Sequence, residues 1–203
     1  LHYCLNRACP SRKIEGMIHF ASRDAMDIEG LGPSIVEEFF GEGFIADIPD
    51  IYKLYDKAET IKALDGWGDK AISNLLASIE KSKGQSLERL LFGLGIKEIG
   101  HKTAKVLARR FKSLDAFKEA TEEEFLRIPD IGPVASRSLY EYFHEQDNLD
   151  LIEELRAQNL NFEYLGAEEA DEGNFFYGKT VVLTGTLVRY TREEMTTILE
   201  NKG

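Results

Sequence analysis

The sequence has few cysteines, no long apolar run and no excess of positive charge. Two cysteines are too few for a disulfide framework, and no stretch is apolar for long enough to span a membrane or to form the apolar part of a signal peptide. The formal net charge is −11 and the isoelectric point is about 4.9, so the protein has no globally positive field to attract nucleic acid. We therefore expect a cytoplasmic protein whose contacts with any nucleic acid are local.

Four short loops share one pattern, in which an apolar residue is followed by a glycine and then by residues typical of a helix. They are Gly30-Leu31-Gly32, Gly66-Trp67-Gly68, Glu98-Ile99-Gly100 and Asp130-Ile131-Gly132. The last glycines follow one another at intervals of 36, 32 and 32 residues, a spacing that marks a repeated structural unit. Apolar residues recur at helical spacing before and after the third loop, at Leu87, Leu90, Leu91, Leu94, Ala104, Leu107, Ala108 and Phe111. The predicted unit is therefore two helices joined by a tight hairpin.

The start of a helix leaves backbone N–H groups without partners and carries partial positive charge. A glycine there lets a phosphate oxygen approach these amides, and it also reaches the backbone angles of tight hairpins. One such loop is more often an ordinary turn, but four in series indicate a surface that holds a phosphodiester backbone without reading bases. The predicted binding residues are Gly32, Gly68, Lys70, Gly95, Lys97, Gly100, Lys102, Lys105, Gly132 and Arg137.

The charge around the four loops is uneven. The third loop has the densest positive charge, because Lys97, Lys102 and Lys105 surround Gly100. The first loop has no lysine nearby and is followed by Glu37 and Glu38. We therefore predict that the third loop makes the principal contact with DNA and that the first contributes least.

These loops resemble the helix-hairpin-helix motif of DNA repair and ligation proteins, and longer runs extend the resemblance. The runs His19–Gly32, Leu94–Gly100 and Gly178–Leu187 occur in the order found in bacterial NAD-dependent DNA ligases. Nearly the whole chain is similar to the C-terminal portion of such an enzyme, and because it begins at Leu1 we expect a piece of a longer polypeptide. The resemblance implies a monomer near the bacterial nucleoid that binds nicked double-stranded DNA through its phosphates, as part of an enzyme that seals nicks in replication and repair.

Nick sealing in this family requires a lysine that takes adenylate from NAD and lies in a Lys-x-Asp-Gly motif. The segment Lys62–Gly66 has one residue too many, and its Asp-Gly belongs to the second loop. A P-loop and a dinucleotide-binding glycine fingerprint after a strand are also lacking. We therefore predict no catalytic residue in this chain, and the resemblance assigns NAD and magnesium to the intact enzyme.

Cys4 and Cys9 are close enough in sequence to give two thiolates to one zinc ion, but a structural zinc site needs four ligands. The spacing alone leaves free thiols or a disulfide as alternatives, and His2 and His19 are conceivable further ligands. The resemblance implies a four-cysteine zinc finger. Its last pair would be Cys4 and Cys9, and its first pair would precede Leu1.

The expected fold is mainly α, with tandem helix-hairpin-helix repeats between a partial zinc finger and the opening β-α element of a BRCT domain. The expected parts are a finger segment at 1–22, four hairpin repeats at 23–160, a linker at 161–174 and a truncated BRCT-like segment at 175–203. Capping boxes are predicted at Thr121 with Glu124 and at Thr191 with Glu194.

In the BRCT-like segment, the β-branched run Lys179–Thr184 predicts a short strand. In BRCT domains that bind phosphate, the positions matching Thr184 and the Gly185 amide are ligands, together with a basic residue of a later helix. We find no such later helix here, so we interpret Gly185 as a glycine needed for the turn.

Two other functions remain open from the residues. The first is a non-catalytic repair or recombination protein built on tandem hairpins, which a Lys-x-Asp-Gly motif upstream of Leu1 would exclude. The second is a helical scaffold for protein interactions, in which the glycine loops are only turns. The repetition and the lysines count against the scaffold, and DNA binding that weakens steeply with salt would exclude it.

Overall fold

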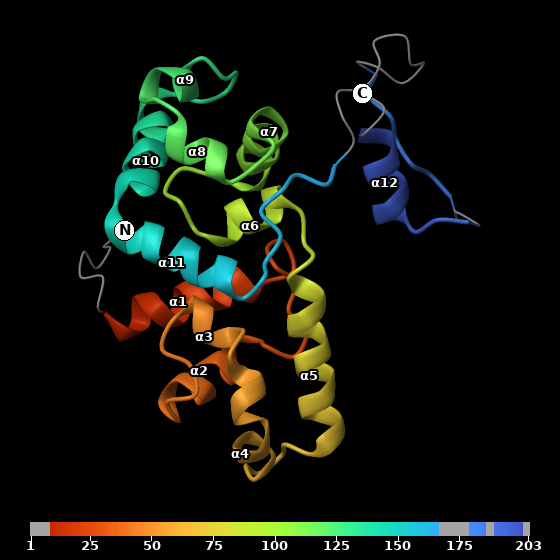
Figure 1. Cartoon of the computed structure of the whole chain (residues 1–203). Helices are drawn as coiled ribbons and strands as arrows, with labels where there is room; N and C mark the ends of the chain where they lie inside the picture. The colour runs from red at the N-terminus through yellow and green to blue at the C-terminus, as the bar shows by residue number, and fades with distance from the viewer. Residues whose placement is uncertain (1–8, 167–178, 186–188, 201–203) are drawn as a thin grey trace. The chain divides into compact units, whose positions relative to one another are not determined.

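The computed structural model describes residues 9–166, 179–185 and 189–200 (Figure 1). These residues form helices joined by turns, and within them the backbone pairing of extended segments is limited to an isolated antiparallel bridge between Ser113 and Glu163. The predicted mainly α class is thereby confirmed. The chain divides into two compact units, residues 1–164 and 165–203. None of the described helices is both long and apolar enough to cross a membrane.

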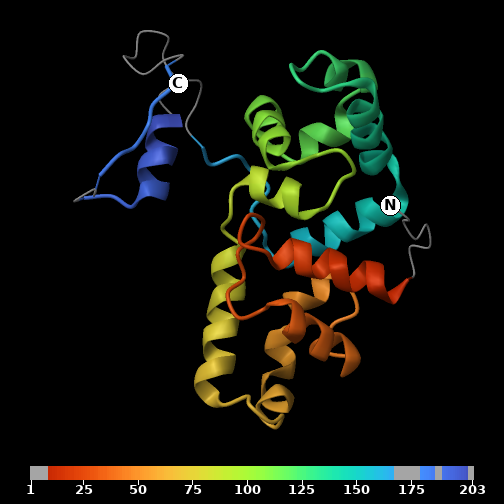
Figure 2. The same cartoon turned by 180° about the vertical axis from the view of Figure 1, so that it is seen from behind.

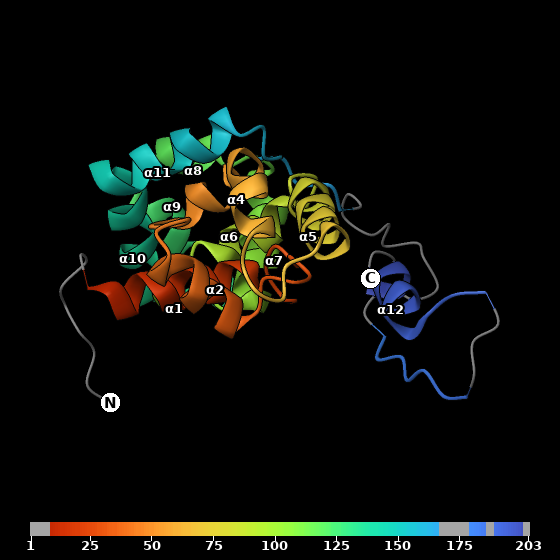
Figure 3. The same cartoon turned by 90° about the horizontal axis from the view of Figure 1, so that it is seen from below.

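The first unit holds the four repeats. Its elements are α1 (Pro10–Ala21), α2 (Pro33–Gly41), α3 (Ile48–Ile51), the 3-10 helix η1 (Leu54–Lys57), α4 (Ala58–Lys62), α5 (Asp69–Ser82), α6 (Leu87–Gly93), α7 (His101–Phe111), α8 (Asp115–Glu119), α9 (Glu122–Leu126), α10 (Pro133–His144) and α11 (Gln146–Ala157). In Figure 1, α2, α4 and α5 lie in one half and α7 to α10 in the other, with α1 and α11 between them, and Figure 2 shows the same division from behind. Seen from below, α1 and α11 lie at opposite edges (Figure 3).

One apolar core runs through the whole first unit. The stripe predicted on α7 is confirmed, since Ala104, Leu107 and Ala108 are fully buried. Each large apolar side chain that is fully buried contributes about 1.5 to 3 kcal/mol. The helices therefore hold their positions by packing and not by helix propensity, which keeps the loops between them in fixed places.

Helix α1 belongs to this core, although its residues fell in the predicted finger segment. Met17 and Phe20 are fully buried. A Cβ on Gly93 of α6 would lie 3.2 Å from Cδ2 of Phe20, so glycine allows α6 to pack closely on α1. The predicted boundary at residue 22 is therefore not a break in the structure, because α1 and the hairpin repeats share one core.

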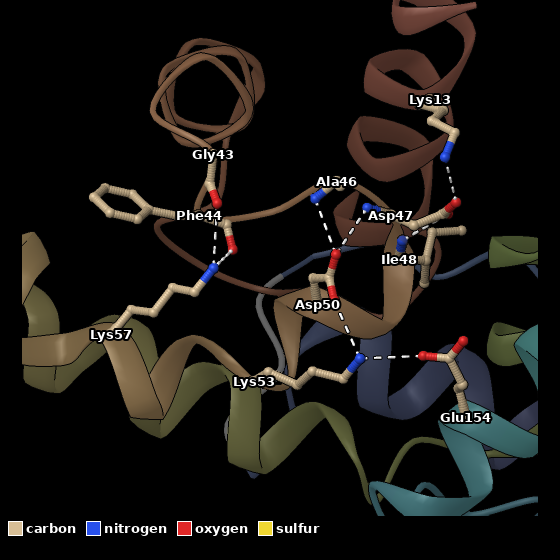
Figure 4. Close-up of polar contacts among 10 residues, drawn as sticks. All are labelled: Lys13, Gly43, Phe44, Ala46, Asp47, Ile48, Asp50, Lys53, Lys57 and Glu154. Carbon is tan, nitrogen blue, oxygen red and sulfur yellow. Dashed lines mark hydrogen bonds and ion pairs between the residues drawn. The ribbon is translucent and has the colours of Figure 1, made fainter. Parts of the chain in front are cut away.

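Polar contacts also tie α3 to the helices on either side of it (Figure 4). Asp47 and Asp50 form a capping box at the start of α3, and Asp47 accepts from Lys13 of α1 at 3.0 Å. Lys53 pairs with Asp50 at 3.2 Å and with Glu154 of α11 at 3.1 Å. Burial alone would raise the pKa of Asp50, but hydrogen bonds from a backbone amide and from Lys53 outweigh it and hold that pKa below its usual value.

The first four residues of the predicted linker, 161–164, belong to the first unit, and its residues 167–174 lie outside the described residues. Phe162 and Leu160 are buried, and the carbonyls of Phe162 and Glu163 accept from the amides of Leu114 and Leu87 at 2.9 and 3.1 Å. Residues 161–164 thus close the first unit, because they pair with the starts of α6 and α8 in space. Such pairing between segments far apart in the sequence cannot be predicted from local composition.

The second unit contains α12 (Arg192–Glu200), which starts directly after Thr191 as the capping pattern predicted. Glu194 lies outside the described side chains. The predicted strand at Lys179–Thr184 is wrong: these residues are described and form no strand. Val182 is 77% exposed and no β-bridge joins residues 179–184 to another described segment, so strand propensity alone does not make a strand. The φ of Gly185 is +80°, which fits the turn interpretation.

Candidate nucleic-acid interface

The four glycine loops have the same backbone hydrogen bond. We call the segments Ile28–Gly32, Leu64–Gly68, Ile96–Gly100 and Ile128–Gly132 hairpins 1 to 4. In each, the N–H of the fourth residue donates to the carbonyl of the first, at 3.2, 3.2, 3.1 and 3.2 Å respectively. The third residue always has a positive φ, between +65° and +88°. This is the pattern of a type II turn, so the sequence repeat is a repeat of backbone structure.

Apolar residues at the first and fourth positions fix each turn to the core. Ile96 and Ile99 are buried in hairpin 3, and Ile128 and Ile131 are buried in hairpin 4. Trp67 of hairpin 2 is half-buried. These anchors hold the backbone of the turns in place while the second and third residues face solvent.

Hairpin 1 differs from the other three hairpins in the element that precedes its turn. Helices α4, α6 and α9 precede hairpins 2, 3 and 4, as the helix-hairpin-helix pattern predicts. Before hairpin 1, α1 ends at Ala21 and residues 22–26 form a turn. The predicted unit of two helices joined by a turn is therefore wrong for hairpin 1, because residues 22–26 form a turn where the other hairpins have a helix. The hairpin turn itself and the helix after it follow the pattern.

The last glycine of each hairpin is not needed for an unusual backbone conformation. Gly32, Gly68, Gly100 and Gly132 have φ between −99° and −76°, which any residue adopts. The positive φ lies two residues earlier in each turn. An ideal Cβ on any of the four would meet no atom within 4 Å. Sequence reasoning was therefore wrong to assign the unusual angles to these glycines, and what they provide is open space above the start of a helix.

These open helix starts contrast with two capped helices of the same unit. Asp47 caps α3, and Thr121 caps α9 in the capping box that the sequence predicted. Helices α2, α5, α7 and α10 begin at the four glycines, and none of them has a side chain that caps its amides. Their first-turn N–H groups therefore have no side-chain partner, and the positive end of the helix dipole lies behind them. Helices α2 and α10 offer fewer such groups, because Pro33 and Pro133 have no N–H.

Hairpin 3 carries exposed cations at the edge of this opening. Lys97 is the second residue of the turn, Lys102 is the second residue of α7, and both are exposed. Lys105 is half-buried on the next turn of α7. Gly95 lies earlier, where its φ of +65° ends α6, so its glycine has a structural reason.

The other predicted cations differ in their surroundings. Lys70 is exposed as the second residue of α5, the position that Lys102 has in α7. Arg137 pairs with Glu141 on α10 at 2.9 Å, and this hydrogen bond and the attraction of Glu141 raise the pKa of Arg137. The Arg137 charge is therefore partly neutralised within its own helix.

Hairpins 1 and 2 face a common acidic cavity. It has a volume of about 890 Å³ and lies beside Gly30 and Gly66. The aromatic ring of Trp67 packs on Phe39 of α2, with 5.0 Å between ring centroids, and so joins the two hairpins. The charged residues that line the cavity are Glu29, Glu38, Asp65 and Lys81. Sequence reasoning noted the acidic residues after hairpin 1, but it did not predict that the two turns meet.

A second cavity brings α1 next to hairpin 3. It has a volume of about 690 Å³, and the charged residues that line it are Arg12 and Lys13 of α1, Lys97, Asp47, Glu141, Glu145 and Asp147. Lys13 is paired with Asp47, whereas Arg12 is exposed. Arg12 thus adds a cation near hairpin 3 that sequence reasoning missed, because only the folded chain brings α1 to this loop.

The predicted zinc ligands fall partly outside the described residues. Cys4 lies outside them, and Cys9 precedes α1 as its N-cap residue. His19 donates from Nε2 to the carbonyl of Phe92 at 2.8 Å in the tautomer that places its proton there. Among the described residues there is no group of three or more potential metal ligands. Of the two predicted cysteine ligands, only Cys9 is among the described residues, and it directly precedes α1.

Comparison with known proteins finds a motif that matches two of the hairpins and relatives that align with nearly the whole chain. Residues 89–152, which contain hairpins 3 and 4, match a model of the helix-hairpin-helix motif. Nearly the whole chain aligns with proteins named DNA ligase: 98% of it at 47% identity in Thermoanaerobacter pseudethanolicus, 94% at 45% in Brevibacillus brevis and 98% at 42% in Bacillus subtilis. The resemblance to DNA ligases is confirmed. The chain spans about 30% of the length of these relatives.

Proposed function

We propose that this chain is the C-terminal, DNA-binding part of an NAD-dependent DNA ligase, and that it holds the sugar-phosphate strands around a nick. The observation that carries the proposal is the repeated turn that leads four times to an uncapped glycine at the start of a helix. Side chains cap α3 and α9, and α1, α4, α6, α8 and α11 lack a capping side chain, but in residues 9–164 a glycine is the N-cap residue only of the four helices that follow the repeated turns. Four open helix starts on one core suit four phosphates better than four ordinary turns.

Backbone contacts also fit the task. A ligase must seal a nick in any sequence, and contacts to phosphates position a protein on DNA without reading bases. The net charge of −11 does not prevent this, since at physiological ionic strength charges more than about 8 Å apart in solvent are largely screened. The field near each helix start therefore decides the contact, and a monomer can make all of these contacts.

The charged side chains near each turn determine which hairpin should bind DNA most strongly. Hairpin 3 adds Lys97 and Lys102 to its open amides, with Arg12 nearby, whereas the hairpin 1 turn adjoins Glu29 and Glu38. Hairpin 3 is thus the principal contact and hairpin 1 the weakest. This order is the one that the sequence predicted from local charge.

The chemistry of sealing belongs to the rest of the enzyme. NAD and magnesium would act in that other part, where NAD would supply the adenylate group, and the residues of this chain would hold the DNA. Cys4 and Cys9 would supply two thiolates to a zinc ion, whose other two ligands the resemblance places upstream of Leu1. Because Cys9 is the N-cap residue of α1, and α1 is packed in the hairpin core, such a finger would be fixed directly to the hairpin unit.

Fluorescence anisotropy with labelled duplexes tests the proposal. The chain should bind nicked duplexes of two unrelated sequences equally well, and its affinity should fall steeply as salt rises because bound counterions are released. Incubation with labelled NAD should leave no covalent adenylate on the chain. Absence of binding at low salt would contradict the DNA-holding role, and adenylate on the chain would contradict the assignment of catalysis to the rest of the enzyme.

A further inference from the structure

Hairpin 4 carries exposed apolar side chains where hairpin 3 carries charge. Val134 is the second residue of α10 and is 63% exposed, and Leu126 ends α9 on the other side of the turn and is 47% exposed. Pro129, the second residue of the turn, is exposed between them. We call Leu126, Pro129 and Val134 the apolar rim of hairpin 4.

The repeat gives Val134 and Pro129 charged counterparts in hairpin 3, whereas the counterpart of Leu126 is the buried Leu94. Val134 is two residues after Gly132, as Lys102 is two residues after Gly100. Pro129 has the place that Lys97 has in hairpin 3. Both counterparts are exposed cations. Hairpin 4 therefore has an apolar residue at the places of Lys97 and Lys102, whereas Arg137 stands at the place of Lys105.

The cations nearest to the rim, Arg137 and Arg127, have acidic neighbours that offset their positive charge. Arg137 on α10 pairs with Glu141 at 2.9 Å. Arg127 follows Leu126, but Glu124 lies close enough for its own pKa to be lowered, first by a hydrogen bond from Thr121 and in smaller part by Arg127. The start of α10 has no capping side chain, so the amides that follow Pro133, which itself has no N–H, remain open.

We propose that the apolar rim of hairpin 4 packs against deoxyribose rings of the DNA strand whose phosphate lies at the helix start after Gly132. The inference rests on the proposed function. A phosphate at those amides brings the adjacent sugars over the first turn of α10. The C–H faces of the sugars fit a valine, whereas the phosphate oxygens next to them fit a lysine. Hairpin 4 thus binds the backbone by apolar burial, and hairpin 3 binds it by charge.

These two modes differ in their response to salt. A lysine that neutralises a phosphate releases counterions, and its removal lowers the slope of log affinity against log salt. Burial of an apolar side chain releases none, so its loss lowers affinity equally at every salt concentration. The salt slope therefore separates sugar packing from a charge effect.

Val134→Thr keeps the shape of the side chain and replaces a methyl group by a hydroxyl, and Leu126→Ser removes the other large apolar group. Each should weaken binding to nicked duplex about threefold to fivefold without changing the salt slope, as expected for partial loss of apolar burial. Val134→Lys should instead raise the salt slope by about one. Tyr55→Ser, which removes an exposed aromatic ring from η1, is the control and should bind as the parent does.

The titrations include the parent and Lys102→Ala, and thermal melting shows that each variant is folded. If the parent binds and Lys102→Ala lowers its salt slope while Val134→Thr and Leu126→Ser bind like the parent, the sugar contact is wrong and the proposed function stands. A reduced salt slope for Val134→Thr would also overturn the inference. Absence of binding by the parent overturns both.

Discussion

Hairpins 1 and 3 differ in the side chains around a shared backbone turn. The second residue of the turn is Glu29 in hairpin 1 and Lys97 in hairpin 3. The second residue of the next helix is Ser34 in the first case and Lys102 in the second. Both turns close with the same hydrogen bond and both lead to an uncapped glycine. The comparison separates two contributions to DNA binding: an uncapped helix start, which all four hairpins share although Pro33 and Pro133 have no N–H, and side-chain charge, which only some supply.

The largest effect should come from closing the open helix start of hairpin 3. Gly100→Val places a branched side chain where a phosphate approaches, and the φ of −84° and the empty space around Gly100 let it fit without strain. Affinity for nicked duplex should fall about tenfold, or about 1.4 kcal/mol. The measurement is an anisotropy titration, with denaturant unfolding to show that the variant remains folded.

Gly32→Val is the matched control in hairpin 1, where the φ is −76° and the space around Gly32 is equally empty. It should change affinity less than Gly100→Val, since acidic residues already weaken that contact. A larger loss for Gly32→Val than for Gly100→Val would reverse the ranking and make hairpin 1 the principal contact.

A smaller effect should follow from removing one charge of hairpin 3. Lys102 is exposed, so Lys102→Ala should leave the fold intact. Affinity should fall evenly across DNA sequences, and the salt slope should decrease by about one unit. Ser34→Lys gives hairpin 1 the same charge at the same position and should raise the slope if that turn touches DNA. An unchanged slope for Lys102→Ala would mean that Lys102 does not contact a phosphate.

The smallest effect on DNA binding should come from a helix that is already capped. Thr121→Ala removes the side chain that accepts from the Glu124 amide at the start of α9. Unfolding free energy should fall by about 1 kcal/mol, a typical value for loss of an N-cap. Affinity for DNA should stay that of the parent at temperatures where the variant is folded. A large loss of affinity in the folded variant would show that capped and open helix starts are not functionally distinct.

Local sequence rules predicted the hairpins well. The spacing of Gly32, Gly68, Gly100 and Gly132 located four turns that the structure shows to share one hydrogen-bond pattern. Helical periodicity and the Thr121 capping box also predicted local structure correctly. These features succeed because each depends on residues within one or two turns of a helix.

Features that depend on distant segments could not be predicted in this way. The packing of Phe20 on Gly93 joins α1 to the hairpin unit, and only the fold brings Arg12 next to Lys97. The predicted strand at Lys179–Thr184 failed for the same reason, because a strand needs a neighbour that local propensity does not supply.

Backbone amide shifts on addition of nicked duplex test the central claim most directly, that open helix starts at the hairpin glycines bind phosphates. In two-dimensional ¹H–¹⁵N spectra of the chain, the largest shifts should fall on the first-turn amides of α7, next to Gly100. Smaller shifts should appear after Gly68 and Gly132, and the smallest after Gly32. The capped starts of α3 and α9 should shift little. Shifts as large at the capped helices as at the glycines, or none at the four glycines in a chain that binds DNA, would contradict the account.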